Sequence, residues 1–144
     1  MINDSPIQQV RCAKVLGVTF NESASWEPHV ESLCKQLNSR LSLLRRVSPY
    51  LNKSGTLRFY NACLHNKLLY CSSVWGPCSY TLLLQFLRLQ KRPARIILFA
   101  DYTTPSVALF SELNWILIAD QVKCKKLQPL FSILVNPDAP VCLR

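Results

Sequence analysis

The chain has 144 residues, of which 49% are hydrophobic, and carries a formal net charge of +9 with a pI near 9.4. This composition allows one domain with a real core, and it excludes a disordered protein, which would have too few apolar residues to fold. The positive charge favours a polyanionic partner, and nucleic acid is the most common polyanion.

Residues 8–20 alternate in polarity, which is typical of β-strands. The apolar side chains stand at even positions, namely Val10, Cys12, Leu16, Val18 and Phe20. Lys14 breaks the pattern, and we therefore predict a β-hairpin that turns near Ala13 and Lys14. Because a single hairpin is only marginally stable in water, it must pack on another sheet or on the helices that follow.

An amphipathic helix is predicted from Ser25 to about Val47. Ser25 is a suitable N-cap, and Pro28 is tolerated because amides of the first turn lack partners in any case. Apolar side chains recur at steps of three or four: Trp26, Val30, Leu33, Leu37, Leu41 and Leu44. The opposite side carries Lys35, Ser39, Ser42 and Arg46. This polar stripe fits either a phosphate backbone or simple contact with solvent.

Two further helices are expected, one from Ser54 to about Cys71 and one starting near Ser79. The apolar face of the latter carries Leu83, Phe86, Leu87, Gln90, Ala94 and Ile97. Its other face carries Arg88, Arg92 and Arg95, spaced four and three residues apart without an acid at neighbouring helical positions. These arginines repel one another, so an external anion would stabilise them. Pro93 is expected to kink this helix or divide it.

Residues 68–87 form a charge-free run that is long enough to span a bilayer. Serines and a Gly76–Pro77 pair interrupt it, and such a pair would leave backbone groups unpaired in lipid. We therefore predict a turn between two buried helices and no association with a membrane.

The remaining chain is predicted to be helical. Thr104 and Pro105 have the pattern of an N-cap and a first-turn residue for a short helix through about Leu113. A last helix is expected over 118–135, interrupted at Pro129, followed by a Pro-rich segment. The predicted fold is mainly α, with a short N-terminal β-hairpin and about five helices, divided into segments 1–22, 23–100 and 101–144.

The acidic residues are distributed unevenly along the chain. All eight lie outside residues 32–100. Because solvated surfaces normally mix both signs, this window predicts a strongly positive face. It contains these basic residues: Lys35, Arg40, Arg45, Arg46, Lys53, Arg58, Lys67, Arg88, Lys91, Arg92 and Arg95.

Seven cysteines occur without a C-x-x-C pair or a signal-peptide pattern. They indicate reduced side chains in an intracellular protein of the nucleus or cytoplasm rather than a secreted one. A zinc site made of His65, Cys71 and Cys78 is conceivable, but its spacing matches no familiar zinc motif.

No residue pattern indicates catalysis. Neither His29 nor His65 has an evident carboxylate to orient it, and the three glycines are isolated, which excludes a phosphate-binding loop of the Walker type. The segment "FADY" at 99–102 approaches the aromatic-x-Asp-Asp motif of polymerases, but Tyr102 replaces the second aspartate. Two-metal chemistry needs several converging carboxylates, so we expect no catalytic residue, no metal ligand and no cofactor.

Several segments together resemble the reverse transcriptases of non-LTR, LINE-type retrotransposons. The likeness begins with "INDSPIQQVRCAKVLGVTFNESASWEPHV" at 2–30. It continues in the same order to the end of the chain, through "SRLSLLRRVSPYL" at 39–51, "YCSSVWG" at 70–76, "LLQFLRLQKRPARII" at 83–97, "TPSVALFSELNW" at 104–115 and "APVCL" at 139–143. The chain departs from the family at Asn66 and Pro93, where Pro and Ala are usual, and at Leu69 and Phe86, where Asp and Leu are usual.

The resemblance implies a C-terminal part of such an enzyme. Residues 1–22 would be the primer-grip hairpin at the end of the palm, 23–100 a thumb, and 101–144 the segment beyond it. The fingers and the aspartate-bearing palm, which would hold two Mg²⁺ ions, would then precede this chain and be its partners. The primer-grip core would be Lys14, Val15, Leu16, Gly17 and Val18.

A thumb closes over the duplex of template and primer, such as an RNA–DNA hybrid. The side chains expected to hold its phosphates without reading sequence are Lys35, Arg46, Arg88, Arg92 and Arg95. Three hypotheses therefore stand: a truncated reverse transcriptase that binds duplex but cannot polymerise, a stand-alone basic helical module for nucleic acid, and a protein-interaction remnant with no nucleic-acid role. The protein-interaction remnant would associate with another protein through an exposed apolar patch.

Overall fold

The structure is a computed structural model that describes residues 10–76 and 78–135. Its fold is mainly α with an N-terminal hairpin, as predicted; the Pro-rich segment after Val135 lies outside the described residues. The strands are β1 Cys12–Val15 and β2 Val18–Asn21. The helices are α1 Glu27–Val47, α2 Lys53–Tyr60, α3 Asn66–Leu69, α4 Ser72–Trp75, α5 Tyr80–Leu98, α6 Ser106–Leu113 and α7 Ile118–Val135, with a 3₁₀ turn η1 at Ser48–Tyr50 and a π-helical turn η2 at Asn61–His65.

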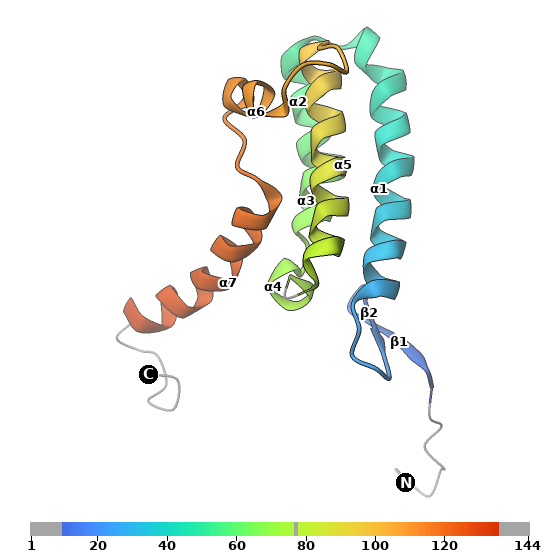
Figure 1. The fold of residues 1–144 in the computed structure, drawn as a ribbon, viewed down its shortest axis with the longest axis vertical. Coiled ribbons are helices and arrows are strands. Elements are labelled where there is room, and N and C mark those ends of the chain that lie inside the picture. Colours follow the sequence, from blue (N-terminus) through green and yellow to red (C-terminus); the bar gives the residue numbers. More distant parts are fainter. Residues whose placement is uncertain (1–9, 77, 136–144) are drawn as a thin grey trace, which may run out of the picture.

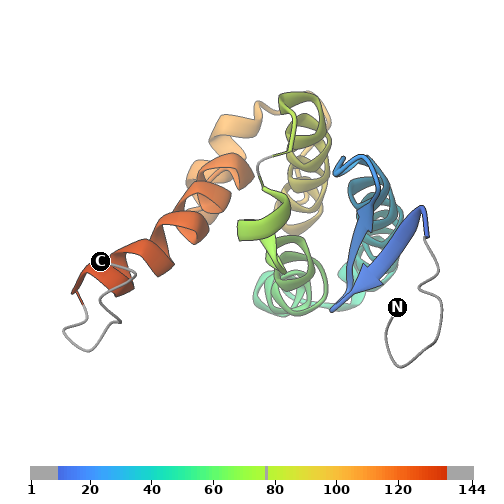
Figure 2. The ribbon, with the colours of Figure 1, turned by 90° about the horizontal axis from the view of Figure 1, so that it is seen from below.

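Three long helical runs stand side by side and form the body of the protein. They are α1, α5 and the continuous run from α2 through η2 to α3 (Figure 1). The hairpin lies at the N-terminal end of α1, α6 packs on α5, and α7 leads away on the side opposite the hairpin (Figure 2). One core joins all three runs to the first turns of α7; its largest fully buried side chains include Leu37, Leu44, Trp75, Phe86, Ile97 and Ile118.

Helix α1 follows the prediction closely, because it ends at Val47 and buries the predicted apolar stripe from Val30 to Leu44. Its start differs by one residue: Trp26 occupies the N-cap position in a helical conformation, without a side-chain cap. Ser25 still contributes, since its Oγ accepts a hydrogen bond from the Glu27 amide at 3.3 Å. The half-buried Trp26 packs edge-on against Phe20 of β2.

The predicted second helix is continuous from Lys53 to Leu69, apart from the π-helical turn. Its N-cap is Asn52, whose Oδ1 accepts a hydrogen bond from the Gly55 amide at 2.7 Å. The helix ends before Cys71, because that residue has a φ of 51° and cannot continue a right-handed helix.

The breaks expected at two prolines are absent. Pro93 lies inside α5 and Pro129 inside α7, and neither divides its helix. An interior proline loses one backbone hydrogen bond and crowds the preceding turn. At Pro93 the burial of the ring in the core offsets this cost. Helix α6 begins at Ser106 with Pro105 as its N-cap residue, one position later than predicted.

The charge-free run 68–87 divides between the end of α3, the short α4 and the start of α5. A break between buried helices was predicted here, and the structure confirms it. Within residues 10–76 and 78–135, no helix has both the length and the hydropathy that crossing a membrane requires.

The hairpin turn is not where the alternation pattern placed it. Cys12 pairs with Asn21 and Val15 with Val18, so the turn consists of Leu16 and Gly17 rather than Ala13 and Lys14. Both turn residues have positive φ, 48° and 81°, as a two-residue hairpin loop of type I′ requires. Gly17 meets this requirement without strain, whereas alanine and lysine would not.

Gln90 is a buried polar residue that ties α5 to the segment before α7. Its Nε2 donates to the Ile116 carbonyl at 2.8 Å, and its Oε1 accepts from the Ile118 amide at 3.0 Å. Both polar ends of the amide are therefore satisfied in the core. These two hydrogen bonds anchor the start of α7 to α5.

Candidate nucleic-acid interface

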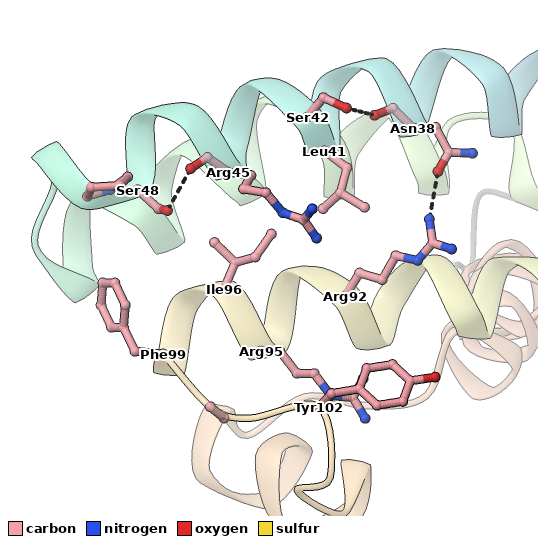
Figure 3. Close-up of a pocket in the computed structure, with 12 residues that line it drawn as sticks. Asn38, Leu41, Ser42, Arg45, Ser48, Arg92, Arg95, Ile96, Phe99 and Tyr102 are labelled. Carbon is pink, nitrogen blue, oxygen red and sulfur yellow. Dashed lines mark hydrogen bonds between the residues drawn. The ribbon is translucent and has the colours of Figure 1, made fainter.

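A groove of about 810 Å³ runs between α1 and α5 and reaches the loop after α5. Leu41 and Ile96 supply apolar lining, and Asn38 and Ser42 supply polar lining (Figure 3). Its basic lining residues are Arg45, Arg92 and Arg95. No Asp or Glu is among the described residues that line it.

The three arginines are held in different ways. The side chains of Arg45 and Arg92 extend into the space between the helices, and Arg92 Nη1 donates to Asn38 Oδ1 at 3.0 Å (Figure 3). Arg95 lies beside the loop, where its Nη2 donates to the Thr104 carbonyl at 3.4 Å. In the part of the chain that the structure describes, no arginine forms an ion pair with a carboxylate.

Two of these arginines have a local structural role as well. Arg45 and Arg95 stand in the last turns of α1 and α5, where a cation interacts favourably with the partial negative charge of the helix end. This effect does not explain Arg92, which stands earlier in α5. The three positive charges in one groove thus exceed what the helix ends require.

The structure brings together only part of the predicted phosphate-binding set. Arg92 and Arg95 share the groove, and Arg88 lines an adjoining hollow of about 140 Å³ that shares Asn38 and Arg92 with it. Lys35 and Arg46 are exposed on α1 but line neither space.

Sequence reasoning missed Arg45 as a member of the groove. The signal was present, because Asn38, Ser42 and Arg45 recur at steps of four and three along α1. The basic residue Arg40 has a different use: its Nη1 donates to the Cys63 carbonyl in the π-helical turn.

The five residues resembling a primer grip form the end of the hairpin. Val18 is buried, whereas Leu16 at the turn is 84% exposed; Lys14, Val15 and Gly17 are exposed too. Tyr70 Oη donates to the Leu16 carbonyl at 2.8 Å. The Thr19 amide donates to His29 Nδ1 at 3.3 Å. These two hydrogen bonds attach the hairpin to the helical body.

The hydrogen bond between the Thr19 amide and His29 predicts that the stability of the fold depends on pH. Burial, then the charges of Lys67 and Lys14, lower the pKa of His29 below its ordinary value of 6.5. Burial and Lys125 lower the pKa of His65 in the same direction. The unfolded chain therefore binds protons more readily, so stability is full above pH 6.5 and falls as the pH drops below it.

We expect the thermal unfolding midpoint to be lower at pH 5.5 than at pH 7.5, because protonation of His29 removes the acceptor for the Thr19 amide. The variant His29→Gln should show a smaller difference between the two pH values. Circular dichroism melts of both proteins measure this. An equal pH dependence in the variant would show that His29 is not the titrating group.

Metal-binding side chains are dispersed in the structure. Across residues 10–76 and 78–135, no three His, Cys, Asp or Glu side chains lie close enough to hold a metal ion. His65, Cys71 and Cys78 are thus not brought together as one such group. Asp101 of the "FADY" segment is exposed on the loop between α5 and α6.

Comparison of the chain with protein-family models, with curated proteins and with solved structures found no match.

Proposed function

We propose that this chain is a thumb-like part of a non-LTR reverse transcriptase and that it holds duplex nucleic acid along the groove between α1 and α5. On this proposal the palm and fingers of the parent enzyme supply the catalytic residues, and this chain alone does not polymerise. The observation that carries the proposal is the gathering of Arg45, Arg92 and Arg95 in one groove without a lining carboxylate. Phosphates of a duplex would neutralise these charges and release their counterions.

The proposal implies an intracellular protein of the nucleus or cytoplasm. The six cysteines in the described part of the chain are all free thiols. Free thiols persist in a reducing compartment, which supports this localisation.

Replacing the three groove arginines should weaken binding and reduce its salt dependence. For the wild-type chain and a labelled DNA duplex of arbitrary sequence, we expect log affinity to fall linearly with log salt, by about 0.9 per phosphate contacted. In the variant Arg45→Gln/Arg92→Gln/Arg95→Gln this slope should flatten by about 2 to 3, because three contacts are lost. Fluorescence anisotropy titrations at several salt concentrations measure both quantities.

The matched control is Lys123→Gln/Lys125→Gln/Lys126→Gln, which removes the same charge from α7 outside the groove. It should change the slope far less than the groove variant. Equal effects of the two variants would assign binding to net charge alone. Absence of salt-dependent binding by the wild-type chain would instead favour a protein-interaction remnant.

The family part of the proposal has its own test. Translating the transcript upstream of Met1 in the same frame should reveal an aromatic-x-Asp-Asp motif within roughly a hundred codons, as the palm layout requires. An untranslated leader with a promoter would favour a stand-alone basic module instead.

A further inference from the structure

The loop between α5 and α6 places an exposed aromatic ring beside the groove arginines. Tyr102 is 88% exposed, although it also lines the groove. A ring of this size usually packs on apolar neighbours, since it buries a large area when it is covered. Tyr102 instead rests on a cation, because Arg95 Cζ lies 5.3 Å from the centre of its ring (Figure 3).

Contacts within the loop fix this pair. Helix α5 ends at Leu98, and the next residue, Phe99, adopts a left-handed conformation with a φ of 50°. The Ala100 amide then donates to the Arg95 carbonyl at 3.0 Å, which closes the helix end and reverses the chain. The Thr104 amide donates to the Asp101 carbonyl at 3.1 Å. The loop is therefore a defined turn that presents the Tyr102 ring with one face on Arg95 and most of its surface in solvent.

We propose that the exposed face of Tyr102 stacks on an unpaired nucleobase of a strand whose phosphates run along the groove arginines. This inference rests on the proposed function and adds a preference for substrates with a single-stranded overhang. Aromatic rings next to a positive groove are the usual arrangement for binding single strands, because every base offers a π-face. Bases inside a duplex are already stacked and cannot offer a face to Tyr102.

The charges of the loop favour a base over a phosphate at this position. Asp101 is exposed next to Tyr102, and its carboxylate would repel a phosphate placed against the loop. The phosphates are attracted instead to Arg45 and Arg92, between the helices. The neutral base can then approach Tyr102, whose opposite face is already supported by the Arg95 guanidinium.

The test compares a blunt DNA duplex with the same duplex carrying a short unpaired overhang. For the wild-type chain we expect the overhang to raise affinity by about 5- to 150-fold, which corresponds to the 1–3 kcal/mol of one stacked base. In Tyr102→Ala this ratio should fall to about one, whereas Tyr102→Phe should retain it. The salt dependence with either ligand should be similar in wild type and Tyr102→Ala, because stacking neutralises no phosphate.

Tyr80→Ala is the matched control, because it removes another exposed tyrosine from the opposite end of α5, outside the groove. It should leave the ratio close to the wild-type value. An equal loss in both variants would overturn the assignment to Tyr102, and so would a wild-type ratio near one. If either outcome is found while the wild-type chain still binds the blunt duplex in a salt-dependent way, the proposed function stands and only the role of Tyr102 is overturned. If the wild-type chain binds neither the blunt duplex nor the duplex with an overhang, both proposals fail.

Discussion

Replacing Trp75 by alanine is expected to lower the free energy of unfolding by about 3–5 kcal/mol, the usual cost of truncating a buried tryptophan. Trp75 is completely buried at the point where the short α4 meets the body. Its ring lies 4.8 Å from Phe86 and 6.2 Å from His29, measured between ring centres. The indole Nε1 donates to the Tyr70 carbonyl at 2.8 Å, so the substitution also removes this hydrogen bond.

Because domains of this size are stable by only about 5–15 kcal/mol, Trp75→Ala should remove a large part of the total. Urea denaturation monitored by circular dichroism measures the change. Val74→Ala is the control on the same helix, since Val74 is exposed, and it should cost less than about 1 kcal/mol. A loss in Trp75→Ala no larger than in Val74→Ala would contradict the packing described for α4.

The long helices could be predicted from the sequence because their signals are local. Both ends of α1 could be predicted to within two residues. The early proline marks the start of the helix, and the apolar period with its last buried leucine marks the end. The predicted position of the hairpin turn was wrong, because it was taken from the alternation of apolar and polar residues without regard to the backbone geometry of a turn. Gly17 was the informative residue, since a two-residue turn needs positive φ and the alternating side chains carry no such information.

The candidate site was predicted less well, since a groove depends on how two helices pack. The predicted stripe shares Ser42 with the groove, but its members Ser39 and Arg46 each stand one residue beyond the groove positions Asn38 and Arg45. One residue is about a quarter of a helical turn, which is enough to move a side chain off the groove. Tyr102 could not be placed at all, because its position depends on the turn at Phe99 and on Arg95.

The break expected at Pro93 is absent for a related reason, whereas Pro129 is exposed and α7 continues through it without such packing. Local propensity disfavours proline inside a helix, but tertiary packing decides the outcome. At Pro93 the ring is fully buried between helices, and the helix continues through it. The sequence shows the cost of this proline but not the contacts that offset it.

Gly76 illustrates a packing constraint that the turn pattern did not reveal. The pair Gly76–Pro77 was interpreted as a turn signal, yet Gly76 has an ordinary helical conformation at the end of α4. A Cβ atom at this position would lie 2.3 Å from Val122 Cγ1 of α7 and 2.3 Å from the Ser72 carbonyl oxygen. Glycine is therefore required by the close approach of α4 and α7 rather than by its freedom to adopt positive φ.

Gly76→Ala is accordingly expected to destabilise the fold by about 1–3 kcal/mol, because the added methyl would clash with Val122 of α7 and with the Ser72 carbonyl oxygen. Urea denaturation measures the loss, and Ser73→Ala, at an exposed position of the same helix, should change stability by less than about 0.5 kcal/mol. Shortening the residue that the methyl meets should relieve the clash, so the double variant Gly76→Ala/Val122→Ala should lose less than the sum of the two single losses. Strictly additive losses would mean that α4 and α7 do not meet at these two residues, and the position assigned to α7 would then be wrong.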